Sequence, residues 1–132
     1  MVTLDTSALI ALLNPRDPDN PTMTEAVDPY LGDLVVPVAV LSEVSHFIER
    51  DLGGRRLNLL VQDIIDGAIR LDCGERDWPR IQQLVQRYDT LPLGLADAAV
   101  IACGERRGGL IATLDYRHFG TVASEGTFRI VP

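Results

Sequence analysis

The sequence predicts a three-layer α/β/α sandwich around a mainly parallel sheet of about five strands. Two observations support this fold class. Short apolar segments alternate along the chain with longer segments in which apolar residues recur at helical spacing. The chain has 132 residues, of which 46% are hydrophobic and 23% charged, a composition that suits a globular protein. We therefore expect residues 1–132 to form a single domain.

The expected strands are short and mostly apolar, and turn or helix signals separate them. In chain order they cover residues 2–4, 34–37, 68–72, 110–115 and 127–132. Strands that alternate with helices are typical of parallel sheets with right-handed connections. The carboxyl ends of the strands and the amino ends of the helices then share one edge of the sheet, which is where such folds bind ligands.

The expected helices lie between these strands. In chain order they cover residues 5–13, about 22–31, 38–54, 55–67, 75–88 and 93–107. A polar residue among residues 5–7 can cap the first helix, and Pro29 interrupts the second near its end. Glycine pairs at 53–54 and 108–109 end the third and the last.

The composition excludes several classes of protein. A net charge of −7, with arginine as the basic residue at all 12 positions, argues against broad attraction to nucleic acid. No apolar run reaches the roughly 18 residues of a membrane span. No basic region precedes the apolar N-terminal segment, as it would in a secretory signal. Cys73 and Cys103 lack the spacing of a metal site, so we expect two buried thiols in a reduced, cytoplasmic protein.

Residues 93–104 read LGLADAAVIACG, an almost wholly apolar segment whose one charge is Asp97. A helix that is apolar on every side is normally buried, and an isolated charge in it is costly. Asp97 can complement the helix dipole in the first turn, or it can bind a cation. The other acids of the chain favour the second hypothesis.

Three further acids fall on the same expected edge of the sheet. Asp5 follows the first strand, Asp115 closes the fourth, and Glu43 lies about one and a half turns into the helix after the second. Each has an ordinary alternative, as a helix cap, a turn residue and a solvated side chain respectively. Four carboxylates at one edge repel one another unless a cation neutralises them. Oxygen ligands suit Mg²⁺ or Mn²⁺, and one or two such ions can activate water for in-line attack on a phosphodiester bond.

Four segments carry a resemblance to a known family: LDTSALIALL, LSEVSHFIERDLG, YDTLPLGLADAAVIACGER and IATLDYRHF. In this order they resemble the PIN-domain ribonucleases, and within them the VapC toxins of bacterial VapBC toxin–antitoxin systems. The resemblance covers nearly the whole chain. It implies a PIN-like sheet and a toxin endoribonuclease that depends on Mg²⁺ or Mn²⁺, with tRNA or rRNA as substrate. It also implies a homodimer and a VapB-like antitoxin whose tail occupies the acidic site.

Matched to this chain, the catalytic and metal-binding acids of the family are Asp5, Glu43, Asp97 and Asp115. The last of these positions varies among PIN proteins. The apolar helices near residues 8–13 and 40–60 exceed what one small core needs, so we expect the antitoxin to bind there.

Side chains beside the acids are candidates for supporting roles. Thr6 and Ser7 can hydrogen-bond Asp5 or a metal-bound water, or they can cap the first helix. Thr113 shares a strand face with Asp115 and can orient the site, or it can be an ordinary strand residue. Arg117 adjoins Asp115, and it is the arginine that we expect to contact an RNA phosphate.

Two polar residues near the site have other interpretations. Asp89, in the loop before the Asp97 helix, fits either a turn residue or a group that orients a ligand. We expect His118 to be structural, because a metal-activated water needs no histidine as its base.

Of two competing functions, the sequence excludes one and leaves the other open. A signalling receiver domain also combines an α/β fold with acids and Mg²⁺, but that family needs an acidic pair after the first strand and a late lysine. This chain has a single Asp5 there and no lysine, which excludes it. A catalytically inactive PIN-fold module that only binds proteins stays open.

Overall fold

The computed structural model describes the whole chain, residues 1–132. Its strands are β1 (Val2–Leu4), β2 (Leu34–Pro37), β3 (Ile69–Asp72), β4 (Leu110–Ala112) and β5 (Arg129–Val131). Its α-helices are α1 (Thr6–Leu13), α2 (Asn20–Val27), α3 (Leu41–Phe47), α4 (Gly54–Ile65), α5 (Trp78–Arg87), α6 (Leu95–Arg106) and α7 (Tyr116–Ala123). Two 3-10 turns, η1 (Asp28–Tyr30) and η2 (Val38–Val40), and a π-helical segment, η3 (Ile48–Leu52), adjoin α2 and α3.

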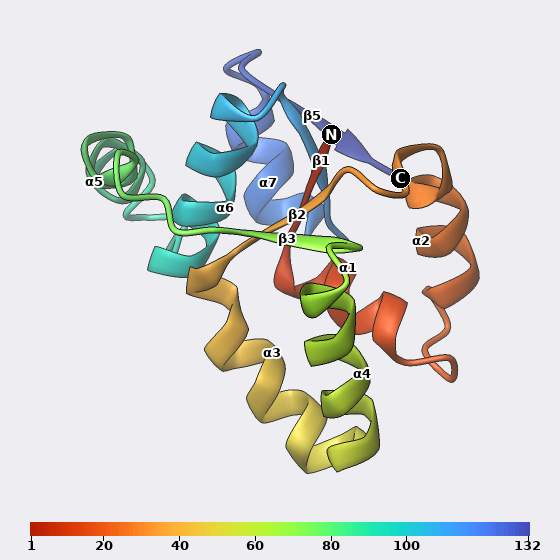
Figure 1. Cartoon of the computed structure of the whole chain (residues 1–132). Coiled ribbons are helices and arrows are strands. Elements are labelled where there is room, and N and C mark those ends of the chain that lie inside the picture. The colour runs from red at the N-terminus through yellow and green to blue at the C-terminus, as the bar shows by residue number, and fades with distance from the viewer.

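The strands form one sheet in the order β3-β2-β1-β4-β5, and every neighbouring pair is parallel. This confirms the predicted fold class. The chain moves outward from β1 through β2 to β3 and then returns across the sheet to β4 and β5. With right-handed connections, α1, α2 and α4 cover one face and α6 and α7 the other (Figure 1). The order reverses between β1 and β4, and open α/β sheets bind ligands beside the carboxyl ends of such a strand pair.

The segment predicted as one helix over residues 38–54 is divided in the structure. It begins as η2, continues as α3 and ends in η3. Gly53 then adopts a φ of +85°, which few residues other than glycine tolerate, and α4 packs back against η3. Figure 1 shows this helical hairpin extending away from the strands.

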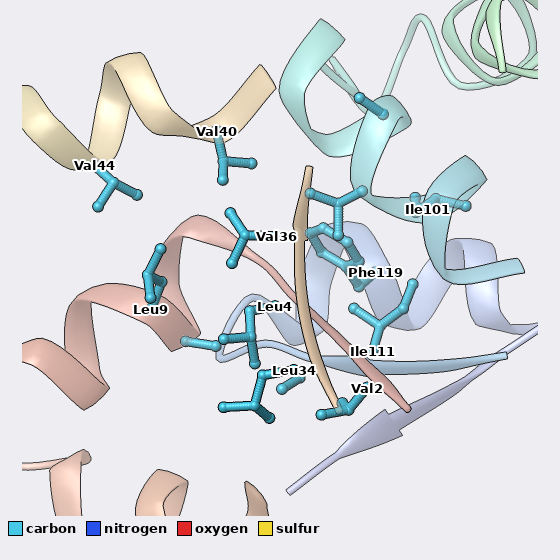
Figure 2. Close-up of a cluster of buried hydrophobic side chains, with 14 of the residues drawn as sticks. Val2, Leu4, Leu9, Leu34, Val36, Val40, Val44, Ile101, Ile111 and Phe119 are labelled. Carbon is cyan, nitrogen blue, oxygen red and sulfur yellow. The ribbon is translucent and has the colours of Figure 1, made fainter. Parts of the chain in front are cut away.

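The core lies on both faces of the sheet (Figure 2). The alternation along β1 places Val2 and Leu4 on one face, whereas Thr3 lies on the other, against Cys103 of α6. α6 approaches β4 closely because Gly104 has no side chain: a Cβ there would clash with the Ile111 side chain. Residues 98–104 of α6 are all buried, as expected for so apolar a segment.

Several predicted details are wrong. The fourth strand ends at Ala112, and α7 begins shortly after it, where no helix was predicted. This short helix depends on burying Phe119 and Val122 against the core, which is a tertiary effect. The second helix begins at residue 20, and its last part is a 3-10 turn around Pro29. Cys73 is exposed in the loop after β3, whereas the other thiol is buried. No helix combines the length and the apolar character that crossing a membrane requires.

Candidate metal centre

Asp5 lies directly after β1, at the carboxyl edge of the sheet. Its backbone N–H donates to the Ala112 carbonyl of β4 at 3.0 Å, so the strand pairing fixes its position. Only 4% of the residue is exposed. Asp5 occupies the N-cap position of α1, but its carboxylate accepts no capping hydrogen bond. The helix-cap interpretation therefore does not account for this side chain.

Two hydroxyl groups hold the Asp5 carboxylate. Ser7 Oγ donates to Asp5 Oδ2 at 2.9 Å, and Thr113 Oγ1 donates to the same oxygen at 2.8 Å. The backbone N–H groups of Leu114 and Asp115 donate in turn to Ser7 Oγ at 2.9 Å and to Thr113 Oγ1 at 3.0 Å. These bonds tie the end of β1 to the segment after β4.

Asp97 lies half-buried in the first turn of α6. Burial raises the pKa of its carboxyl, and the nearby Asp5 carboxylate raises it further. Neither Asp5 nor Asp97 forms an ion pair with any cationic side chain. The repulsion from Asp5 and the absence of a paired arginine favour the interpretation of Asp97 as a cation ligand.

Asp115 is the N-cap residue of α7, and His118 holds its carboxylate. Asp115 Oδ1 accepts the His118 backbone N–H at 3.0 Å, and Asp115 Oδ2 lies 2.8 Å from His118 Nδ1. The potential ligand atoms of Asp97, Asp115 and His118 lie within 4.8 Å of one another. Asp5 lies outside this group of ligand atoms, but its carboxylate is near enough to Asp97 to raise the pKa of that carboxyl. Thr113 Oγ1 links Asp5 to the backbone of Asp115. Asp5 follows β1, one of the two strands between which the sheet order reverses.

The remaining predicted site residues form no hydrogen bond or ion pair with the side chains of this cluster. Glu43 is exposed in the first turn of α3 and lies outside the group of ligand atoms just described. Thr6 is half-buried beside Asp5. Arg117 is exposed and forms no ion pair, and Asp89 is exposed in the loop before α6. Roles for these residues in the site therefore stay predictions.

His118 also lies beside these acids, although we predicted a structural role for it from the sequence. The available signal was its spacing of three residues from Asp115, which is the spacing of a helix N-cap and the N3 residue that interacts with it. Without α7, that spacing had no structural meaning.

A second group of buried acids is neutralised by the protein itself. Asp72, at the end of β3, and Asp77, before α5, are each 6% exposed. Arg106 donates to Asp72 Oδ1 at 2.6 Å and to Asp77 Oδ1 at 2.8 Å, and Arg107 donates to Asp72 Oδ2 at 2.8 Å. The Arg106 guanidinium, helped by Arg107, holds the pKa of Asp72 at about 2. This network has its cations already and is structural.

The donor set of the first cluster fits a divalent cation. Asp97 and Asp115 offer carboxylate oxygens within 4.8 Å of one another, Asp5 adds a third carboxylate near Asp97, and no arginine pairs with any of the three. Hard oxygen donors of this kind suit Mg²⁺ and Mn²⁺. A bound cation would also relieve the repulsion that raises the pKa of Asp97.

A parallel α/β sheet with carboxylates that no arginine neutralises, near the point where its strand order reverses, is typical of the α/β nucleases with an acidic site. Comparison with known proteins agrees. The PIN domain family model matches residues 2–124. Ribonuclease VapC26 of Mycobacterium tuberculosis (strain ATCC 25618 / H37Rv) is 30% identical over 133 residues, which cover 98% of each chain. The chain belongs to the PIN domain family and, within it, to the VapC ribonucleases.

Two solved structures share the fold. One is M. tuberculosis VapC20, described as a sarcin–ricin loop cleaving toxin, with a TM-score of 0.78 and 17% identity over 92% of this chain and 95% of that chain. The other is FitAcB from Neisseria gonorrhoeae, with a TM-score of 0.69 and 20% identity over 100% of this chain and 97% of that chain. Both likenesses confirm the predicted PIN-like fold.

Proposed function

We propose that this VapC ribonuclease is the toxin of a VapBC-type toxin–antitoxin pair. It acts in the cytoplasm as an endoribonuclease and hydrolyses RNA phosphodiester bonds at the cluster of Asp5, Asp97 and Asp115. The observation that carries the proposal is that ligand atoms of Asp97 and Asp115 lie within 4.8 Å of one another, with the Asp5 carboxylate near Asp97 and no arginine paired with any of the three. Such a cluster is unfavourable for the folded chain alone and favourable for a chain that binds a cation.

We assign metal binding to Asp5, Asp97 and Asp115, with Mg²⁺ or Mn²⁺ as the ion. A divalent ion held by carboxylates activates water for in-line attack and offsets the charge that develops on the phosphate. Ser7 and Thr113 orient the Asp5 carboxylate through their hydroxyl groups. The half-buried position of Asp97 lowers the local dielectric constant, which strengthens its attraction for a cation.

Glu43, Arg117 and Thr6 act from outside the cluster in this proposal. Glu43 lies on α3, which follows β2, the strand paired with β1, and its long side chain can bring a fourth carboxylate toward the ion. The exposed Arg117 lies two residues after Asp115, so its guanidinium can bind a phosphate of the RNA. Thr6 adjoins Asp5 and can hydrogen-bond water in the site.

The charge of the chain bears on the RNA that it takes. With a net charge of −7, the chain gains little from general attraction to RNA. We therefore propose a folded loop of tRNA or rRNA as the substrate, since the shape of such a loop and its unstacked bases can be recognised without a basic surface. The related VapC20 is a sarcin–ricin loop cleaving toxin.

Cleavage of total cellular RNA by the purified chain tests the proposed function. We expect discrete fragments with Mg²⁺ or Mn²⁺, none with EDTA and none from Asp97→Asn. Asp19→Asn is the matched control, because it removes an exposed carboxylate that forms no ion pair. Absence of cleavage, together with no rise in melting temperature on adding Mn²⁺, would instead support the inactive protein-binding module.

An apolar groove of about 400 Å³ supports the antitoxin partner. Its lining includes Leu9, Leu12 and Leu13 of α1 and the largely exposed Leu31. We propose that a VapB-like antitoxin places an apolar segment there, in part of the region predicted over residues 8–13. Leu31→Asp should then reduce co-purification of the antitoxin encoded beside the gene, while the unpartnered chain keeps its melting temperature. Unchanged co-purification would exclude this groove.

Exposed apolar side chains support the homodimer. Trp78 and Leu95 are 59% and 56% exposed and line the same surface cavity between α5 and α6. We propose that a second copy of the chain covers them. Light scattering after size-exclusion chromatography should give a dimer mass for the parent and a monomer mass for Trp78→Glu. A monomeric parent would exclude this interface.

A further inference from the structure

His118 has no role in the proposed function, yet its ring lies among the acids. The side chain is 21% exposed and comes from the first turn of α7. Its potential ligand atom lies within 4.8 Å of those of Asp97 and Asp115. The chain has one other histidine, His46, which is exposed on α3. A half-buried imidazole beside carboxylates therefore needs an explanation.

The contact between His118 and Asp115 has a defined direction. An ionised carboxylate has no proton to donate, so we assign Nδ1–H of His118 as the donor to Asp115 Oδ2 across this 2.8 Å contact. The backbone N–H of His118 donates to the other oxygen, Oδ1, at 3.0 Å. One residue thus engages both oxygens of the carboxylate.

Asp115 needs this support more than the other acids do. Its side chain is 34% exposed, whereas Asp5 is 4% exposed and held by two hydroxyl groups. Asp97, itself close to Asp5, carries a charge of the same sign. Repulsion would therefore favour rotation of a free Asp115 carboxylate into solvent. The two bonds from His118 oppose that rotation.

We propose that His118 is a positioning residue, which holds both oxygens of Asp115 and keeps that carboxylate within reach of Asp97. The inference rests on the proposed function, in which Asp115 binds the ion. His118 is the last member of a hydrogen-bonded chain that runs from Asp5 through Thr113 and Asp115. Partners that orient ligands in this way raise metal affinity about 10- to 100-fold.

Two substitutions test the roles of the two ring nitrogens separately. The amide nitrogen of Asn lies near the position of Nδ1, and that of Gln lies near the position of Nε2. His118→Asn can therefore keep the side-chain bond to Asp115 Oδ2, whereas His118→Gln and His118→Ala lose it, and the backbone bond to Oδ1 stays in all three. The matched control is His46→Ala, which removes the exposed histidine.

Calorimetric titration of the full chain with Mn²⁺ alone tests the proposal. We expect His118→Ala and His118→Gln to bind Mn²⁺ about 10- to 100-fold more weakly than the parent. His118→Asn and His46→Ala should bind it about as tightly as the parent. The melting temperatures in EDTA report any loss of folding separately.

Three results would overturn the proposal. Parental affinity in His118→Ala would show that Asp115 needs no positioning by the imidazole. Rescue by Gln instead of Asn, with the Gln carbonyl oxygen turned to the position of Nε2, would make His118 a ligand through Nε2. If the parent itself binds no Mn²⁺, the metal site of the proposed function fails as well. If the parent binds Mn²⁺ and the His118 variants bind it equally well, only the positioning role fails.

The tautomer of His118 gives a second readout, independent of metal and RNA. Long-range ¹H–¹⁵N correlation spectra of the metal-free chain contain signals from two imidazoles, and the His46→Ala spectrum assigns them. We expect His118 to carry its proton on Nδ1, and we expect that preference to be lost in Asp115→Ala. A ring protonated on Nε2 alone would contradict the hydrogen bond on which the proposal depends.

Discussion

Two groups of acidic side chains lie at opposite ends of α6, and they differ in what neutralises them. At the amino end, Asp97 lies near Asp5 with no arginine beside either. At the carboxyl end, Arg106 binds Asp72 and a second acid. Asp5 and Asp72 are almost equally buried, at 4% and 6% exposed. Burial alone therefore does not distinguish a ligand site from a structural ion pair.

The distinguishing property is the sign of the pKa shift. Burial and the charge of Asp5 raise the pKa of Asp97, whereas the guanidinium of Arg106 lowers that of Asp72 to about 2. The first group opposes folding at neutral pH until a cation binds, and the second contributes to stability. The helix dipole favours both arrangements, since the acid is at the amino end of α6 and the arginine at the carboxyl end.

The largest expected effect separates activity from stability at the amino end. Asp97→Asn should lower the rate of RNA cleavage by more than about 100-fold, which exceeds the effect of losing a ligand's orienting partner. In EDTA the same variant should have a higher free energy of unfolding than the parent, because a repelled carboxylate is gone. Single-turnover cleavage and urea unfolding measure the two. A less stable variant in EDTA would show that Asp97 is not repelled in the folded chain.

The next effect concerns the carboxyl end and should be on stability alone. Arg106→Leu leaves Asp77 without its guanidinium and Asp72 with only Arg107. Loss of one partner from a fully buried ion pair costs about 3–5 kcal/mol. Because the Arg106 side chain is 36% exposed, we expect about 2–3 kcal/mol here.

Urea unfolding measures that loss. Arg76→Leu is the control, because Arg76 lies in the same surface region, is exposed and forms no ion pair. Mn²⁺ affinity should be unchanged in both variants. If the control lost as much stability, the effect would come from removing a surface arginine and not from breaking the ion pairs.

Local patterns predicted the parts of the molecule that depend on neighbours in sequence. Apolar segments and helix signals were enough for the parallel sheet, and its geometry places Asp5 and the start of α6 at one edge. The close approach of Asp5 and Asp97 follows from that geometry. The position of Glu43 depends on how the segment after β2 divides into three helical types, which the pattern of apolar residues does not encode.

Features that depend on contacts distant in sequence could not be predicted in the same way. α7 contains Gly120 and Thr121, which are weak helix formers, and it is stabilised by its buried residues. The role of His118 depends on that helix. The pairing of Asp72 with Arg106 joins residues 34 positions apart, and only the packing of α6 beside the end of β3 brings them together.

The two groups of acids should respond to pH in opposite directions. The folded pKa of Asp72 is about 2, below its ordinary 3.8, so its stabilisation is present above 3.8 and is lost as pH falls toward 2. That difference corresponds to about 2 kcal/mol. Asp97 has a raised folded pKa, so its unfavourable contribution appears as pH rises through that value.

Urea unfolding in EDTA across acidic pH tests this linkage. The difference in stability between the parent and Asp72→Asn should shrink by about 2 kcal/mol between about pH 5 and about pH 2. The difference between Asp97→Asn and the parent should also shrink on acidification, but with the variant as the more stable protein. If the stability difference between the parent and Asp72→Asn had already disappeared before the pH fell to 4, the pKa of Asp72 would not be depressed.

The smallest effect concerns the hydroxyl groups that take the place of arginine around Asp5. Thr113 and Thr3 are both fully buried, but Thr113 Oγ1 donates to Asp5 at 2.8 Å, whereas Thr3 Oγ1 contacts only Cys103 Sγ at 3.9 Å. Thr113→Val keeps the shape and should weaken Mn²⁺ binding about tenfold by calorimetry, since the carboxylate loses one of the two hydroxyl groups that orient it. Thr3→Val should bind Mn²⁺ like the parent. Equal affinity in both would mean that the Thr113 hydroxyl is not needed to orient Asp5, because the Ser7 hydroxyl and the β1–β4 pairing hold the carboxylate without it.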